Sequence, residues 1–444
     1  SENIEDTTNI LTLGTTYTDV AGNTGTTSQT ANFTIDTTYP TVSSFTISDT
    51  ALKIGDTATV TLVFSEAVSG FNSDDDITVA NGSLSTMTPS GNNITWTGTY
   101  TPSTEIEDAT NVLTLGTGYT DVAGNIGPSA TTANFTIDTS QNIVITFSLS
   151  DSTLSVGDTA TVTLVFSEAV SNFSSDDDIT VVNGSLSTMS TIDDITWTGT
   201  YTPSENIEDT TNILTLGTTY TDVAGNTGIS ATTNNFVIDT YAPVITSVTS
   251  STSDDSYKAG EDVSIQLNLR ESVVVNTDNG TPKLTLDVGG TDVSANYTSG
   301  TGTSTLSFTY TIQAGHNESA LNYKDINSLD LDGATIKDSY GNDTSLNLPA
   351  TNLSTSLAGT STIVIDTSSS TIMSSSISAN NQTITVVFDE NVYSTENGSG
   401  DLETTDFSLS ITSGTESGTA SLTSSNPSSV TVSGNNTTWL LGVP

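Results

Sequence analysis

The sequence contains no cysteine and very few basic residues. The absence of cysteine from all 444 residues excludes disulfides and thiolate metal sites. Six lysine and arginine residues stand against 51 aspartate and glutamate residues, which gives a formal net charge of −45. Binding to nucleic acid depends on a basic face that displaces counterions from phosphates, so this charge argues against DNA and RNA as partners. It argues equally against an anionic membrane surface.

Residues that would support catalysis or membrane insertion are scarce as well. No apolar run approaches the ~18 residues of a membrane helix, so we expect no membrane span in this segment. His316 is the single histidine, and a serine nucleophile needs a positioned base, so the many serines predict no catalytic triad. Paired carboxylates that could serve a glycosidase fall in turns of repeated modules. We therefore expect a protein that is not an enzyme.

The strong negative charge of the chain must be balanced or dispersed in the folded protein. A chain of this charge repels itself at low ionic strength, and either solvated acidic faces in salty water or bound divalent cations relieve the repulsion. The chain is rich in Thr, Ser, Gly, Asn and Asp, a composition typical of secreted β proteins and of disordered chains. Regular alternation of apolar and polar residues, as in Ala58 to Phe64 (ATVTLVF), favours strands. We therefore predict an all-β protein.

One short turn recurs along the chain and defines its organisation. It reads DVAGN at residues 19–23, 121–125 and 222–226, and DSYGN at residues 338–342. Each copy is followed by an apolar run that closes on Ile-Asp-Thr, and the aspartates of these closing motifs are Asp36, Asp138, Asp239 and Asp366. Their spacings of 102, 101 and 127 residues exceed the ~20 to 50 residues of a solenoid repeat and match a whole small domain.

This period predicts a string of tandem domains. Residues 1–38 repeat the C-terminal part of a module. Residues 39–139 and 140–240 are two nearly identical modules, and residues 241–367 form a longer, divergent one. Residues 368–444 restart the pattern but stop before a DxxGN turn, so we expect them to be the N-terminal part of an incomplete module.

The module of residues 39–139 shows a series of short predicted strands. They cover residues 42–47, 58–64, 77–79, 84–87, 94–100, 111–115 and 133–137. Such strands, with a turn signal roughly every ten residues, predict a β-sandwich of immunoglobulin-like architecture. Trp96 and Trp197 occupy the same mid-strand place in their modules, so we expect them to pack in the cores. The acidic triplets, residues 74–76 and 176–178, are predicted to be extended, so that at most two of their side chains could face one ion.

The chain resembles a known class of repeats. Its ATVTLVFSEAV strand, its DVAGN turn and its IDTTYP linker are similar to the tandem immunoglobulin-like repeats of large secreted bacterial adhesins and biofilm-associated surface proteins. The similarity covers essentially the whole chain. It implies an extracellular stalk on the bacterial cell surface, often stiffened by calcium between neighbouring modules of the chain. Cell-surface or matrix ligands would then be bound by regions outside this segment.

The topology of such a sandwich gathers carboxylates at the end where the chain enters each module. There the loop after the second long strand and the DxxGN turn lie beside the preceding linker. Calcium takes about six to eight oxygen ligands in irregular geometry, whereas magnesium requires stricter octahedra. We therefore predict a structural Ca²⁺ site at each junction, with these ligands: Asp36, Glu66 and Asp121; Asp138, Glu168 and Asp222; and Asp239, Glu271 and Asp338.

Other interpretations stay open at this point. The Asp of each DxxGN turn could serve only its own turn, with Gly124 supplying a positive φ, and the acidic triplets could be solvated loops. Residues 241–367 could be a carbohydrate-binding or protein-binding module, which a groove lined by Tyr297, Tyr310 or Tyr323 would favour. The chain could also be a subunit of a self-assembling extracellular filament or sheath, in which other copies complete the incomplete ends.

Overall fold

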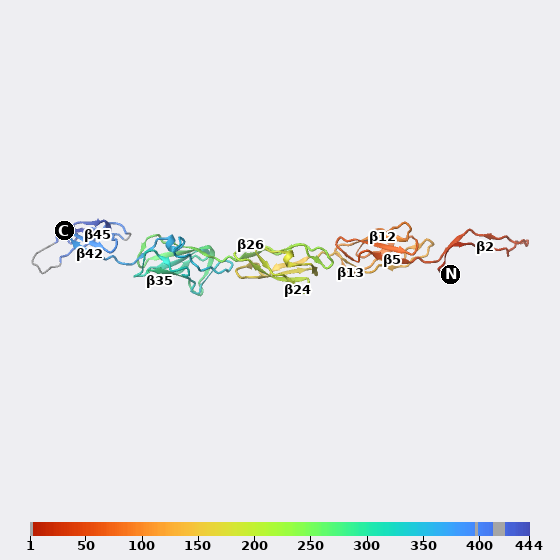
Figure 1. Cartoon of the computed structure of the whole chain (residues 1–444), viewed down its shortest axis with the longest axis horizontal. Coiled ribbons are helices and arrows are strands. Elements are labelled where there is room, and N and C mark those ends of the chain that lie inside the picture. Colours follow the sequence, from red (N-terminus) through yellow and green to blue (C-terminus); the bar gives the residue numbers. More distant parts are fainter. Residues whose placement is uncertain (1–2, 396–397, 412–421) are drawn as a thin grey trace. The chain divides into compact units, whose positions relative to one another are not determined.

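The computed structural model describes residues 3–395, 398–411 and 422–444 of the chain. Strands make up almost all of the regular structure, which confirms the predicted all-β fold of tandem immunoglobulin-like sandwiches. The chain separates into two compact units, Ser1–Tyr241 and Ala242–Pro444, both drawn in Figure 1. Of the helices in these described ranges, none is long and apolar enough to cross a membrane.

The first unit begins with two short strand pairs. β1 (Glu5–Asn9) pairs antiparallel with β4 (Phe33–Asp36), and β2 (Thr12–Leu13) pairs antiparallel with β3 (Ser28–Gln29). Glu5 lies opposite Asp36 across the first of these pairs. Two carboxylate residues therefore stand side by side where the chain leaves β4.

Residues 39–139 contain a full set of sandwich strands. β5 and β7 have the bounds that alternation predicted for the first two long strands. The elements are β5 (Val42–Ile47), β6 (Ala51–Lys53), β7 (Ala58–Phe64), β8 (Val68–Ser69), α1 (Ser73–Asp76), β9 (Ile77–Thr78), β10 (Gly82–Leu84), β11 (Thr88–Pro89), β12 (Thr95–Pro102), β13 (Glu107–Asn111), β14 (Thr114–Leu115), β15 (Thr120–Asp121), β16 (Ala130–Thr131) and β17 (Phe135–Asp138).

These strands form two layers around one core. One sheet has the order β10-β12-β7-β5, and β11 also pairs with β12. The other strands form the β13-β17-β6 and β16-β14-β9 sheets and the β15-β8 pair. Buried side chains of both sets, such as Leu62 of β7 and Phe135 of β17, belong to a single hydrophobic cluster. The two layers are therefore the halves of a sandwich.

Alternation in β7 explains how the core is filled. Val60, Leu62 and Phe64 are buried, and the residues between them are more exposed. Burying one such side chain contributes about 1.5 to 3 kcal/mol. Trp96 packs edge-to-face on Phe71, with 4.9 Å between the ring centroids, but it is half-buried and so lies at the edge of the core that was predicted to hold it.

The short strand β6 was not predicted. The Asp49 Oδ1 accepts a hydrogen bond from the Ala51 backbone N–H at 3.0 Å, which turns the chain after β5. β5 pairs with β7, whereas β6 pairs in parallel with β17, so the chain crosses here from one layer to the other. A strand of three residues is too short for alternation to reveal.

Residues 140–240 repeat this arrangement almost strand for strand. The elements are β18 (Val144–Leu149), β19 (Thr153–Leu154), β20 (Ala160–Phe166), β21 (Val170–Ser171), α2 (Ser175–Asp178), β22 (Ile179–Thr180), β23 (Gly184–Leu186), β24 (Ser190–Thr191), β25 (Thr196–Pro203), β26 (Glu208–Asn212), β27 (Thr215–Leu216), β28 (Thr221–Asp222), β29 (Ala231–Thr232) and β30 (Phe236–Asp239). Trp197 packs on Phe173 with 4.8 Å between the ring centroids, as Trp96 packs on Phe71.

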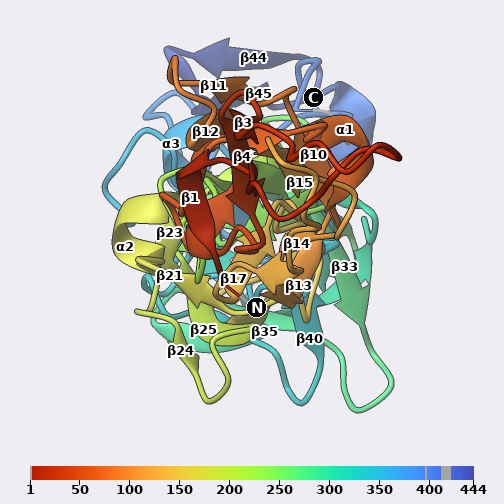
Figure 2. The ribbon, with the colours of Figure 1, turned by 90° about the vertical axis from the view of Figure 1, so that its right-hand side faces the viewer.

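The prediction that the acidic triplets are extended is wrong. Each triplet lies in a single helical turn, α1 or α2, and both turns are labelled in Figure 2. In the first turn, Asp76 Oδ2 accepts a hydrogen bond from the Asn72 backbone N–H at 2.8 Å, and Asp74 Oδ2 accepts one from Thr86 Oγ1 at 3.0 Å. The local hydrogen bond from Asn72 to Asp76 favours the turn over an extended chain, and the bond from Thr86 ties the turn to a later loop.

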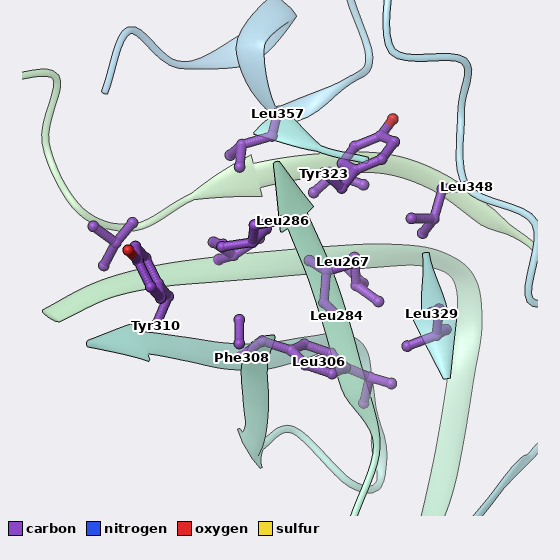
Figure 3. Close-up of a cluster of buried hydrophobic side chains, with 14 of the residues drawn as sticks. Leu267, Leu284, Leu286, Leu306, Phe308, Tyr310, Tyr323, Leu329, Leu348 and Leu357 are labelled. Atoms are coloured by element: carbon purple, nitrogen blue, oxygen red, sulfur yellow. The ribbon is translucent and has the colours of Figure 1, made fainter. Parts of the chain in front are cut away.

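The second unit begins with a larger sheet. Its order is β31-β33-β36-β35-β34-β38, with β39 on β34 and β40 on β33, beside a smaller β32-β41-β37 sheet. The elements are β31 (Ile245–Ser250), β32 (Ser256–Tyr257), β33 (Asp262–Asn276), β34 (Lys283–Val288), β35 (Thr291–Ser299), β36 (Thr303–Thr311), β37 (Asn317–Glu318), β38 (Asn322–Tyr323), β39 (Leu329–Asp330), β40 (Thr335–Lys337), α3 (Leu357–Thr360) and β41 (Val364–Asp366). Figure 3 shows side chains of this core, including Leu267, Leu286 and Phe308.

The described residues after β41 contain a four-stranded sheet. Its order is β42-β43-β45-β44, from β42 (Ile372–Ile377), β43 (Thr383–Phe388), β44 (Val430–Ser433) and β45 (Asn435–Gly442), with the short helical turn η1 (Thr404–Asp406) before β44. Trp439 of β45 is fully buried.

Candidate metal centre

The DxxGN turn holds one carboxylate by local hydrogen bonds. Asp121 ends β15 and is buried. Its Oδ1 accepts hydrogen bonds from the backbone N–H groups of Gly124 at 2.7 Å and Asn125 at 2.9 Å, and its Oδ2 accepts one from Asn125 Nδ2 at 2.7 Å. Gly124 has a φ of +100°, which residues with a side chain adopt only with strain. Asp222 makes the same contacts in the next module at 2.7 to 2.8 Å.

These hydrogen bonds keep the carboxylate of Asp121 charged. Burial raises the pKa of Asp121, but hydrogen bonds from the side chain and backbone of Asn125 and from the Gly124 N–H outweigh burial and hold the pKa below its ordinary value. The expected turn chemistry is therefore present. It does not compete with a metal site, because a carboxylate held ionised is also a better ligand for a cation.

The carboxylates predicted to meet in the first unit do meet. Asp36 ends β4, Glu66 follows β7, and Asp121 reaches them because β15 pairs with β8. Each residue offers one oxygen, and these oxygens lie within 4.8 Å of one another. Ligands about 2.4 Å from one calcium ion are at most about 4.8 Å apart, so the arrangement has the dimensions that calcium requires.

The next junction repeats the cluster with its own residues. Asp138 ends β17, Glu168 follows β20, and Asp222 ends β28, and one oxygen of each lies within 4.8 Å of the others. Asp138 belongs to the linker after one sandwich, whereas Glu168 and Asp222 belong to the next sandwich. A cation held by all three would therefore join the two sandwiches.

Mutual repulsion and burial disturb the proton equilibria of these clusters. Burial, followed by the negative charges of Asp138 and Asp222, raises the pKa of Glu168 to about 7. Burial and the charge of Asp222 also raise the pKa of Asp138. In the other cluster, burial and neighbouring carboxylates raise the pKa of Glu66. Without a cation, each cluster is therefore strained by its own charge.

Each cluster has a fourth carboxylate that the sequence did not reveal as a site residue. Glu107 lies opposite Asp138 across β13 and β17, as Glu5 lies opposite Asp36. The charge of Glu107 adds to the raised pKa of Glu168. The signal that could have found it is the motif E-D-x-T-N, whose glutamate recurs in register with the closing Ile-Asp-Thr.

The Asn of the turn links neighbouring modules, a role that the sequence also did not reveal. Asn226 Nδ2 donates to the backbone oxygen of Asp138 at 3.0 Å, and Asn226 Oδ1 accepts a hydrogen bond from the Ile54 backbone N–H at 2.7 Å. Ile54 lies in residues 39–139, whereas Asn226 lies in residues 140–240. In the preceding copy, Asn125 Nδ2 donates to the backbone oxygen of Thr38 at 3.2 Å. One amide therefore braces its own turn and also contacts the chain before its module.

The third predicted set is divided between the two units. Asp239 ends β30 in the first unit, and Glu271 and Asp338 lie in the second. Within the second unit, Glu271 is part of β33, which pairs with β40, and Asp338 directly follows β40. Asp338 Oδ1 accepts a hydrogen bond from the Asn342 N–H at 2.9 Å, and Oδ2 accepts one from Asn342 Nδ2 at 2.7 Å. The turn is therefore built as in the first unit.

A related pair of carboxylates occurs later in the second unit. Asp366 ends β41, and Glu390 follows β43 as Glu66 follows β7. Burial, followed by the charges of Asp366 and Asp389, raises the pKa of Glu390. We did not predict this pair, because the segment contains no DxxGN turn to complete a set of three.

The tyrosines considered for a binding groove and the single histidine have contacts within the protein. Tyr310 and Tyr323 are core residues, and Tyr297 is half-buried, where its hydroxyl accepts a hydrogen bond from the Thr301 N–H at 2.9 Å. All three tyrosines therefore lie in or against the hydrophobic core of residues 241–367. His316 Nδ1 lies 2.7 Å from the Tyr310 hydroxyl, so the single histidine is engaged by a core residue.

Comparison with known proteins identifies the repeated modules. Residues 36–137 and 139–238 match the profile of the bacterial Ig-like domain. Comparison with curated proteins gave no match. Similar solved structures include an I-band fragment of titin, at 10% identity and a TM-score of 0.35 over 75% of this chain and 99% of the fragment. They also include FdeC, an Escherichia coli adhesin, at 13% identity and a TM-score of 0.26 over 69% of this chain and 95% of that chain.

Proposed function

We propose that this chain is a non-enzymatic stalk segment of a bacterial surface protein and that calcium braces the junctions between its modules. Residues 36–137 and 139–238, which match the bacterial Ig-like domain, supply two of these modules. The observation that carries the proposal is the recurrence of one carboxylate cluster at two successive junctions of the first unit. A stalk consists of repeated modules, and a ligand held jointly by a linker and the following module restricts their relative movement.

The charges at the junctions support a bound cation. Lys53 is the only basic residue between residues 39 and 240, so the acidic residues of these two modules are not balanced by basic ones. Burial, and after it the charges of the carboxylates around it, raises the pKa of Glu168 to about 7. A divalent ion would replace this repulsion by attraction and would let the whole cluster ionise.

The donor set favours calcium over magnesium. Asp138, Glu168 and Asp222 come from a linker, a loop and a turn, and Glu107 supplies a further nearby carboxylate. Calcium accepts such an irregular set of oxygens, whereas magnesium demands a near-ideal octahedron and retains water. Extracellular calcium modules bind with dissociation constants of about 10⁻⁴ to 10⁻³ M, so a surface protein meets enough calcium to fill sites of this kind.

The proposal is tested by titrating the full chain with calcium chloride in a calorimeter and by thermal unfolding with calcium or with a chelator. Calcium at a hundred times its dissociation constant should stabilise a module by about 2.7 kcal/mol. The double variant Glu66→Gln/Glu168→Gln keeps the side-chain shapes and should lose two calcium sites per chain. Its transitions in chelator report whether it remains folded.

The matched control is Asp75→Asn/Asp177→Asn, which removes the same number of charges from exposed positions of α1 and α2. We expect this control to bind calcium as the unmodified chain does. The proposal fails if the unmodified chain binds no calcium, or if the control and the glutamate variant lose calcium equally.

A further inference from the structure

The linker of the second junction departs from the others at one position. Four residues after the aspartate of the closing motif, the chain carries Pro40 at the first junction and Pro243 at the third, but Asn142 at the second. All three positions are buried. A proline ring has no polar side-chain atom to satisfy there, whereas a buried amide must find hydrogen-bond partners or another polar ligand.

Asn142 is only partly satisfied by the protein. Its side chain is fully buried, and its Nδ2 donates a long hydrogen bond of 3.4 Å to the backbone oxygen of Glu168. Its Oδ1 has no hydrogen-bond partner among the residues that the structure describes. Leaving a buried amide oxygen without a partner costs about 1 to 3 kcal/mol, so the position calls for a ligand.

The amide lies beside the carboxylate cluster. It is bonded to the backbone of Glu168, one member of the cluster, and it follows Asp138, another member, by four residues. The cluster thus has two half-buried carboxylates and one buried carboxylate, and the unpartnered amide oxygen belongs to a buried residue hydrogen-bonded to the backbone of one of its members. A single cation satisfies all four, because side-chain amide oxygens are ordinary calcium ligands.

We propose that the Asn142 side-chain oxygen is a further ligand of the cation held by Asp138, Glu168 and Asp222, and that it makes this the tighter of the two junction sites in the first unit. The inference rests on the proposed function, since it presupposes calcium at the junctions. It adds that successive junctions differ in their affinity for calcium. Where Pro40 stands at the corresponding position, the site has one side-chain oxygen fewer.

Calcium chloride titration of the full chain in the Glu66→Gln background, which leaves the second junction intact, tests the inference. Asn142→Leu keeps the approximate size of the side chain but removes its oxygen, and it should weaken calcium binding by at least about tenfold, as loss of a supporting metal-site group does. Asn142→Asp retains an oxygen at the same place and should bind at least as tightly as the parent.

Two results overturn the inference while leaving calcium at the junctions. One is unchanged affinity in Asn142→Leu. The other is equal weakening in Asn142→Leu and Asn142→Asp, which would show that the amide is turned round and serves the carboxylates as an N–H donor. Absence of calcium binding by the unmodified chain would instead remove the proposed function itself.

The reciprocal variant guards against misfolding of Asn142→Leu. Pro40→Asn, in a Glu168→Gln background, adds an amide oxygen at the first junction and should tighten calcium binding at that junction. Failure of Pro40→Asn to increase calcium affinity, in a chain that unfolds normally in chelator, also counts against the inference. Unfolding in chelator gives a second readout, because Asn142→Leu removes an unsatisfied buried oxygen and should raise the midpoint there while lowering it in calcium.

Discussion

Replacing Glu168 by glutamine should stabilise the chain without calcium and destabilise it with calcium. The pKa of Glu168 is raised from 4.5 to about 7, first by burial and then by the charges of Asp138 and Asp222. Ionisation of this carboxylate therefore lowers the free energy of unfolding of the chain. Glutamine has nearly the same shape and no charge, so Glu168→Gln removes this cost and also removes one of the proposed calcium ligands.

The expected gain in stability of Glu168→Gln follows from the size of the pKa shift of Glu168. One pKa unit corresponds to about 1.4 kcal/mol, so ionising Glu168 at pH 8 in the folded chain costs up to about 3 kcal/mol. The side chain is half-buried, and solvent screening lowers this figure to about 1 to 2 kcal/mol. For a module of this size, such a gain raises the unfolding midpoint by roughly 5 to 10 °C.

The pH dependence has a definite sign. Because the folded-state pKa of Glu168 lies above the unfolded value, its proton stabilises the folded chain fully below about pH 4.5, and this contribution is lost as the pH rises through about 7. In chelator, the parent chain should therefore lose stability between pH 5 and pH 8 relative to Glu168→Gln. The gain from the variant should be large at pH 8 and should vanish near pH 4.

The assay is thermal unfolding of the full chain by calorimetry, in chelator and in excess calcium, over this pH range. Asp177→Asn is the matched control, because Asp177 is an exposed carboxylate of the same module and lies outside the cluster. It should shift no midpoint in a calcium-dependent way. A lower midpoint for Glu168→Gln in chelator at pH 8 would show that the cluster is not under electrostatic strain.

Three further changes probe the framework around the cluster. Asn226→Ala removes the hydrogen bonds to the Asp138 carbonyl and the Ile54 N–H, so it should lower the free energy of unfolding in chelator by about 1 to 3 kcal/mol. The control Asn235→Ala removes an exposed hydrogen bond and should lower the free energy of unfolding by less. Gly225→Ala places a side chain on a residue with a φ of +92° and should lower the free energy of unfolding, measured in urea, by about 1 kcal/mol. An unchanged urea midpoint would show that a side chain at this φ causes no strain. Leu164→Ala, at a fully buried position of β20, should cost about 2 to 5 kcal/mol, and Ile192→Ala, at a fully exposed position, should be nearly neutral.

The longest-range features were the easiest to predict from the sequence. The repeat showed that Glu66 and Glu168 occupy the same place in two modules, and sandwich topology then placed each beside a linker aspartate and a turn aspartate. The alternation of β5 and β7 gave their bounds. Both inferences use periodicity, which is set by backbone geometry and is independent of detailed packing.

Features set by a few hydrogen bonds were missed. The helical turns α1 and α2 depend on residues such as Asn72, whose N–H is bound by Asp76, and alternation does not encode that contact. β6 forms because the Asp49 side chain turns the chain toward β17. Glu107 lies between the predicted strands 94–100 and 111–115, but in the structure it begins β13 and faces Asp138 through the strand register, which only the pairing fixes.

The cluster combines two carboxylates with opposite electrostatic states. Asp121 is held ionised by its turn before any ion arrives, whereas Glu66 is discouraged from ionising by burial and by Asp121 itself. One residue is therefore a preformed anion, and the other gains its full charge only when a cation compensates it. If the junctions bind calcium as proposed, a junction of this kind would be weakened by its own charges without the ion and strengthened once the ion binds. Because the arrangement recurs with the module, a long chain would stiffen at every such junction as the calcium concentration rises, and each junction would respond according to its own ligands.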